Sequence, residues 1–167
     1  MKKLIILFAV ICLTACTNLS NMKISSTAFE NEGMIPEKYT CDGVNVNPPL
    51  KFEEIPEGTK SLALIVDDPD APVGLWVHWL VWNIDPKTSE IQENSVPNGA
   101  TQGTTSFGTV GYGGPCPPSG THRYLFKIFA LDTEIDLDSA GDKAALESRM
   151  EEHIIDKAMY MGKYTAN

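Results

Sequence analysis

The sequence predicts a mainly β protein built from stacked antiparallel sheets. Three apolar segments rich in aromatic and β-branched residues are typical of buried strands: residues 61–66, 76–84 and 122–131. The 167 residues include 13 glycines and 11 prolines, which favours many turns over a helical bundle. A chain of this length suits one domain with a sizeable core, and its 43% hydrophobic and 21% charged residues are typical of a globular protein.

The other expected strands are shorter. Residues 22–29 alternate partly between apolar and polar side chains, which predicts a first strand, and residues 50–52 form a second candidate after two prolines. Segment 76–84 is apolar at odd and even positions alike, except at His78 and Asn83. Both faces of this strand are therefore expected to be buried.

Two later regions depart from the strand pattern. Residues 94–121 contain seven glycines and four prolines, and a loop of this length inside one domain is usually functional. A helix is predicted from about Asp142, because apolar residues recur every four positions as far as Ala158. Residues 160–164 are expected to return as an extended segment.

The charge of the chain limits its partners. Acidic residues outnumber basic ones by 22 to 13, which gives a net charge of −9. This balance disfavours attraction of the whole molecule to nucleic acid or to an anionic membrane surface. We therefore expect no nucleic-acid partner.

The N-terminus has the pattern of an export signal. Lys2 and Lys3 precede an apolar run over residues 4–13, which is too short for a stable membrane span. The Leu-Thr-Ala-Cys sequence that ends at Cys16 resembles the lipobox at which bacterial lipoproteins are cleaved and acylated. The alternative is a buried N-terminal element that happens to contain a cysteine.

The export pattern divides the chain into three parts. We expect a lipoprotein signal peptide over residues 1–15, a lipidated tether over residues 16–22 and a folded domain over residues 23–167. Acyl chains on Cys16 would hold the protein at a membrane, since two lipid chains bind stably where one does not. The expected location is the cell envelope, on the periplasmic face of the outer membrane if the cell is Gram-negative.

Two cysteines remain after such processing, Cys41 and Cys116. An even pair in an oxidising compartment favours a disulfide between them. The alternative is two separate buried thiols that pack as small hydrophobic groups. A zinc site has little support, because the sequence contains no CxxC motif and no tight Cys/His spacing.

Four titratable residues mark the ends of the expected strands. Asp68 and Asp70 follow a buried strand on a proline-stiffened loop, His78 lies within an apolar strand, and His122 begins the third long strand after the glycine-rich loop. Taken singly, each has an ordinary explanation as turn chemistry or as a core histidine. Together they suit an anion site, in which a nearby aspartate would raise the pKa of a histidine and orient its ring.

Longer motifs around these residues resemble the phosphatidylethanolamine-binding protein family. They are the DPDAP sequence at residues 68–72, WVHW at residues 76–79 and GYGGPCPPSGTHRY at residues 111–124. The similarity covers residues 24–164 and is greatest to the bacterial branch that resembles Raf kinase inhibitor protein. It implies a large antiparallel sheet packed against a smaller sheet, with a C-terminal helical segment and a small anion pocket at one end. Carried over by motif position, the implied ligand-binding residues are Asp68, Asp70, Pro72, Trp76, His78, Gly114, Cys116, Pro118, His122 and Tyr124.

The resemblance and the residues favour one function over another. We expect non-catalytic binding of phosphate-type anions or phospholipid headgroups, with backbone N–H groups of the glycine-rich loop as donors and no cofactor or metal. A protein target, and a role as an inhibitor or signalling accessory at the envelope, are further expectations. The alternative is a metal-dependent phosphoester hydrolase that uses the Asp and His side chains, although no HExxH motif is present.

Overall fold

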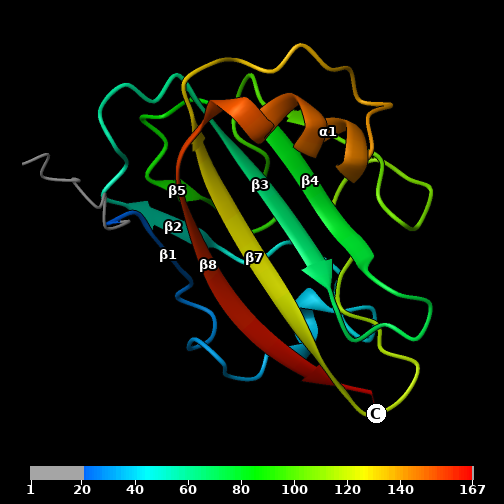
Figure 1. Cartoon of the computed structure of the whole chain (residues 1–167). Helices are drawn as coiled ribbons and strands as arrows, with labels where there is room; N and C mark the ends of the chain where they lie inside the picture. Colours follow the sequence, from blue (N-terminus) through cyan, green and yellow to red (C-terminus); the bar gives the residue numbers. More distant parts are fainter. Residues whose placement is uncertain (1–20, 167) are drawn as a thin grey trace, which may run out of the picture.

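The described part of the chain folds into two antiparallel sheets, which confirms the predicted mainly β class (Figure 1). The computed structural model describes residues 21–166, so the predicted signal peptide, the lipidation site Cys16 and most of the tether lie outside the described residues. The elements are β1 (Lys23–Ser25), η1 (Glu37–Tyr39), β2 (Leu50–Glu53), β3 (Ser61–Asp68), β4 (Trp76–Ile84), β5 (Glu90–Ile91), β6 (Thr101–Gln102), β7 (Thr121–Leu131), α1 (Lys143–Met150), η2 (Glu151–His153) and β8 (Ile154–Thr165).

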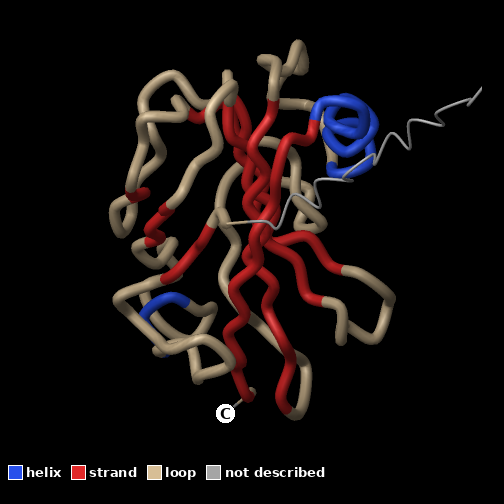
Figure 2. The backbone as a smooth tube through the Cα atoms, turned by 60° about the vertical axis from the view of Figure 1, so that its left-hand side comes forward, coloured by secondary structure: helices blue, strands red, loops and turns tan. Residues whose placement is uncertain are grey.

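The large sheet has the strand order β6-β4-β3-β7-β8, and the smaller one has the order β1-β2-β5. All pairings within both sheets are antiparallel. Figure 2 shows the long strands of the large sheet between the smaller sheet on one side and α1 on the other. The molecule therefore has three layers, and the large sheet is covered on part of both faces.

Side-chain alternation places the core between the two sheets. In β7, every second residue from His122 to Ala130 is buried, and the residues between them lie on the outer face. Strand β3 is buried at all eight positions because its outer face is covered as well. There α1 packs Leu146 and Met150 over the sheet, in contact with side chains such as Trp82.

The predicted helix is correct at its start and wrong at its end. Asp142 caps α1 by accepting a hydrogen bond from the backbone N–H of Ala145 at 2.9 Å. The helix stops at Met150, and the chain pairs with β7 from Ile154 onward. A spacing of four residues fits both a helix and one face of a strand, so the pattern through Ala158 does not separate the two. Strand pairing wins because β8 satisfies the outer edge of β7.

Other boundaries also differ from the prediction. Met22 is already buried in the core, so the packed part of the chain begins before residue 23. The first strand ends at Ser25 rather than at Phe29, which instead packs its ring against Tyr160. No helix among the described residues is long and apolar enough to span a membrane.

Replacing Phe126 should test the shared core directly. Phe126→Ala removes a fully buried ring from the inner face of β7 and should lower the free energy of unfolding by about 3–5 kcal/mol, because a cavity remains. Met159→Ala removes an apolar side chain that is exposed on β8 and should change it by less than about 0.5 kcal/mol. Urea unfolding of both variants provides the measurement, and equal losses would contradict the assigned core.

Candidate ligand-binding site

A cavity of about 240 Å³ lies among residues at the end of β3 and the start of β4. Figure 1 shows these two strand ends at one end of the large sheet. Four segments that are distant in sequence build it: the end of β3 with the loop after it, the start of β4, the glycine-rich segment and the start of β7. Its lining residues are Asp68, Ala71, Pro72, Val73, Trp76, His78, Phe107, Cys116, Pro118 and His122.

Asp68 and His122 form a buried pair at the base of the cavity. They end β3 and begin β7, and antiparallel pairing of these strands brings them together. His122 Nδ1 lies 2.7 Å from Asp68 Oδ2, and the second carboxylate oxygen accepts a hydrogen bond from the backbone N–H of Asp70. Because the ionised carboxylate only accepts, Nδ1 of His122 is the donor. Asp68 thereby fixes the ring and leaves Nε2 of His122 for a ligand.

His78 is oriented by a backbone group instead. Its Nδ1 donates a hydrogen bond to the Gly113 carbonyl at 2.7 Å, which again leaves Nε2 for a ligand. Burial lowers the pKa of His78 from its usual value of 6.5, and this effect outweighs the opposing effects of the Gly113 backbone and the Asp68 carboxylate. The nearby aspartate therefore raises the pKa of His78 as expected, but burial lowers it by more, and the ring is neutral at pH 7.

Tyr124 lies directly behind the cavity. Its ring meets the His78 ring edge-on with centroids 5.1 Å apart. Among the described residues, the Tyr124 hydroxyl is the only buried side-chain oxygen or nitrogen without a hydrogen-bond partner. Burial and the nearby Asp68 raise the pKa of this hydroxyl, and the Cys116 backbone offsets only part of the effect. The group therefore stays a neutral donor, and such an unpaired group is costly unless a water or ligand meets it.

Phe107 is a cavity residue that the sequence analysis did not find. Its ring contacts Trp76 and His78 edge-on, with centroid distances of 5.5 and 5.3 Å. Gly113 permits this position, because a Cβ atom there would lie 2.5 Å from the Phe107 ring. A lone aromatic residue in a loop carries no spacing signal, so only the folded chain shows that it forms a wall. Ala71 and Val73 were missed for the same reason.

The Cys41–Cys116 disulfide forms as predicted, with Cα atoms 5.4 Å apart. It ties the wall of the cavity to the loop after η1, and two backbone contacts reinforce it. The Cys41 N–H donates to the Pro115 carbonyl at 3.0 Å, and the Gly114 N–H donates to the side chain of Asn45 at 2.7 Å. Gly114 is absent from the lining and its N–H already has a partner, so the expected backbone donor at this position is wrong.

Asp70 is directed away from the cavity. Its two carboxylate oxygens accept hydrogen bonds from the Arg123 guanidinium at 2.8 and 2.7 Å. These bonds to Arg123 hold the pKa of Asp70 down at about 2. The assignment of Asp70 to the pocket lining is therefore wrong, and the residue instead fastens the loop after β3 to the start of β7.

Seven of the ten implied binding residues line one cavity: Asp68, Pro72, Trp76, His78, Cys116, Pro118 and His122. Tyr124 stands behind them, while Asp70 and Gly114 hold the surrounding loops in place. Within residues 21–166, the structure brings no three His, Cys, Asp or Glu side chains into an arrangement that could hold a metal ion. The chemistry at this site is therefore set by two oriented histidines, a buried carboxylate and a phenol.

Known proteins of similar sequence identify the family of this chain. The profile of the phosphatidylethanolamine-binding protein family matches residues 25–165. A UPF0098 protein of Methanothermobacter thermautotrophicus is 46% identical over 148 residues, which cover 86% of this chain and 98% of that protein. The chain belongs to the phosphatidylethanolamine-binding protein family.

Two solved structures share the fold closely. A phosphatidylethanolamine-binding protein homologue from Chlamydia trachomatis superposes with a TM-score of 0.84 at 42% identity, over 87% of this chain and 98% of its own. YbcL of Escherichia coli, described as a member of the mammalian family, gives a TM-score of 0.83 at 33% identity over 87% and 99%. The two-sheet architecture is therefore shared with experimentally determined members.

Removing the disulfide should lower the free energy of unfolding of the protein. Cys41→Ser/Cys116→Ser opens a covalent loop between residues 75 positions apart, and chain entropy sets the expected loss at no more than about 4 kcal/mol of unfolding free energy. Urea unfolding of the oxidised protein and of the double variant gives this difference. Alkylation of Cys41 and Cys116 in the unreduced purified protein, located by peptide mass spectrometry, would contradict the disulfide.

Proposed function

We propose that this protein binds phosphate-type anions or phospholipid headgroups in the cavity without transforming them. The observation that carries the proposal is the convergence of His78 and His122, each fixed through Nδ1, with the unpartnered hydroxyl of Tyr124 behind them. His78 comes from β4, and His122 and Tyr124 come from the start of β7. No packing role explains why two oriented imidazoles and an unpaired phenol meet beside one cavity.

The two histidines supply donors that suit an anion. A protonated imidazole presents an N–H at Nε2, and a hydrogen bond from a charged donor to a phosphate oxygen is about twice as strong as a neutral one. Asp68 keeps the His122 ring in position.

The hydrolase alternative receives less support from the geometry. The carboxylate of Asp70 is engaged by Arg123, and Asp68 is engaged by His122 and a backbone N–H. A metal-assisted reaction would need free oxygen and nitrogen ligands converging on one ion. Hydrolysis of a phosphoester is therefore kept as an alternative that the binding experiment can detect.

The proposed place of action is the cell envelope. The motifs that resemble the bacterial Raf kinase inhibitor-like branch support a role there as an inhibitor or accessory acting on a protein target. The Cys41–Cys116 disulfide supports an oxidising compartment, and the N-terminal pattern that ends at Cys16 supports lipid anchoring.

Replacing both cavity histidines should abolish anion binding. His78→Ala/His122→Ala removes both Nε2 groups, and phosphoethanolamine or phosphate affinity should fall at least about 100-fold, since hydrogen bonds to charged groups contribute about 1.5–3 kcal/mol each. Isothermal titration calorimetry on wild type and variant at pH 6 measures this loss.

The third histidine of the chain provides the matched control. His153 is exposed and pairs with Asp132 far from the cavity, so His153→Ala should bind phosphoethanolamine as wild type does. Equal affinity in wild type and the double variant would overturn the site. Metal-dependent release of phosphate from an ester, lost in Asp68→Asn, would establish the hydrolase instead.

Anion binding should be coupled to protonation of His78. Because burial lowers the pKa of His78, the ring is neutral at pH 7 in the free protein, and a bound phosphate dianion raises the pKa by favouring the charged ring. Affinity should therefore weaken, by up to about tenfold per pH unit, as pH rises through the pKa of the complex.

Proton uptake gives the corresponding measurement. Calorimetry with phosphoethanolamine at pH 7, in two buffers of different ionisation enthalpy, should show more proton uptake by wild type than by His78→Ala. The ligand's own titration cancels in this comparison. Identical uptake by the two proteins would show that His78 does not supply charge to the anion.

A further inference from the structure

We propose that two apolar loop tips at the mouth of the cavity dock onto a zwitterionic phospholipid bilayer and so present the cavity to lipid headgroups. This inference rests on the proposed headgroup binding and adds a membrane-contacting surface to it. The surface consists of Val73 and Leu75 on the loop after β3, with Phe107 and Val110 on the glycine-rich segment. We refer to these four residues as the apolar rim.

The first tip belongs to a tight turn between β3 and β4. The Gly74 N–H donates to the Ala71 carbonyl at 3.0 Å, and Gly74 adopts a φ of +99°, a conformation that glycine accepts readily. This turn leaves the Val73 side chain 76% exposed and Leu75 46% exposed. The hydrogen bond fixes the turn while two apolar side chains remain exposed to water, which is unfavourable for them. Exposed apolar side chains on a fixed turn are typical of a surface that contacts a partner.

The second tip, around Phe107 in the glycine-rich segment, is also fixed by hydrogen bonds. Both the N–H and the hydroxyl of Thr105 donate to the Thr109 carbonyl, and Thr104 pairs with Val110. Phe107 stands within this hairpin, and Val110 at its base is 52% exposed. Both tips are therefore preorganised, which lowers the ordering cost of docking.

Both tips contribute a side chain to the lining of one cavity. Val73 and Phe107 both line the cavity, and the Phe107 ring meets Trp76, which follows directly after Leu75. His78 and His122 are buried within the cavity, while the residues of the apolar rim, two of which line it, are exposed. This order fits a molecule whose charged end enters first and whose apolar part stays outside.

A bilayer phospholipid has this arrangement of charge and apolarity, and a free phosphate does not. The charge of the protein selects the kind of bilayer. With a net charge of −9, and with Arg123 already paired to Asp70, the protein gains nothing from an anionic surface. A zwitterionic surface imposes no such repulsion, and the rim docks there by burial of apolar area.

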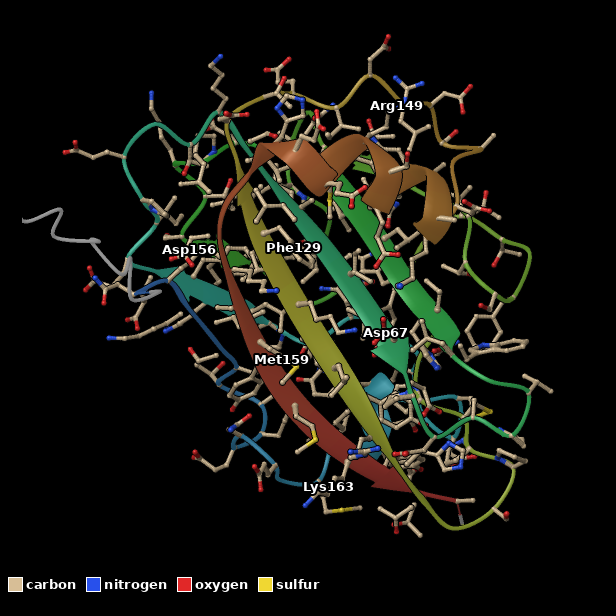
Figure 3. The ribbon with its side chains drawn as sticks, viewed as in Figure 1. Asp67, Phe129, Arg149, Asp156, Met159 and Lys163 are labelled. Carbon is tan, nitrogen blue, oxygen red and sulfur yellow. A yellow bond between two sulfur atoms is a disulfide. The ribbon has the colours of Figure 1, made fainter. Side chains whose placement is uncertain are left out.

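Another exposed apolar pair offers a matched control. Ile155 and Met159 are 39% and 59% exposed on β8, close to the values for Leu75 and Val110. Figure 3 shows Met159 on the open outer face of the large sheet, in the middle of β8. These side chains do not line the cavity, so a general effect of surface hydrophobicity would appear in both pairs alike.

Quenching of Trp76 by brominated lipids tests the docking. The full chain is mixed with phosphatidylcholine–phosphatidylethanolamine vesicles whose acyl chains carry bromine. Trp79 and Trp82 are fully buried, so Trp76 at the cavity mouth is the tryptophan that the lipid can reach. Wild type should be quenched, and this signal reports on the mouth however the N-terminus attaches to the vesicle.

Leu75→Ser/Val110→Ser should lose most of this quenching, whereas Ile155→Ser/Met159→Ser should retain it. Both variants should keep wild-type urea midpoints and wild-type affinity for soluble phosphoethanolamine, because none of the four residues lines the cavity. Replacing part of the lipid by phosphatidylglycerol should weaken the quenching.

The outcomes separate the two proposals. Phosphoethanolamine binding without quenching of wild type, as expected if the rim contacts a protein or nothing, would overturn the docking and leave the binding site intact. Equal quenching in the two double variants would overturn it as well. Quenching that depends on the rim, without phosphoethanolamine binding, would retain the docking and overturn the headgroup function.

Discussion

The burial of β3 on both faces is the constraint on which the rest of the structure depends. The strand lies between β4 and β7, and its eight residues contact the inter-sheet core on one side and the layer under α1 on the other. Its last two residues, Asp67 and Asp68, point to opposite faces of the sheet. Asp67 pairs with Lys127 on the outer face, at 2.8 Å, and Asp68 pairs with His122 on the inner face. A buried carboxylate without such a partner would be strongly destabilising, so both pairs stabilise the end of the sheet where the cavity opens.

The glycine-rich segment forms a wall by satisfying its polar groups within the protein. Gly113 receives the hydrogen bond of His78, Gly114 donates to Asn45, and the Tyr112 hydroxyl donates to the Tyr39 carbonyl at 2.9 Å. The disulfide joins the same two segments covalently. These backbone groups therefore have partners within the protein, and the polar groups that line the cavity are the side chains of Asp68, His78 and His122.

Polarity changes steeply along the depth of this cavity. Within one small volume, the base carries an imidazole–carboxylate pair and an unpaired phenol, while the mouth carries valine, tryptophan and phenylalanine side chains. Burial in the cavity favours the neutral form of His78. The proposed anion binding is therefore coupled to protonation of this histidine.

The sequence by itself determined the class of fold, the long strands and most of the cavity residues. The strands predicted over residues 61–66, 76–84 and 122–131 follow from local apolar patterns and agree with β3, β4 and β7 to within two residues. His78 stood out as a polar residue within an apolar strand, and His122 as the start of the strand after the glycine-rich loop. Only the tertiary structure decided where the helix ends. Apolar residues spaced by four as far as Ala158 fit both the helix period and the strand period, and pairing with β7 selects the strand. It also decided that Asp70 binds Arg123 and that the Gly114 N–H donates a hydrogen bond to Asn45. The position of Phe107 in the wall of the cavity, against Trp76, was likewise decided by the tertiary structure. Those roles depend on contacts between distant segments, and local pattern carries no information about such contacts.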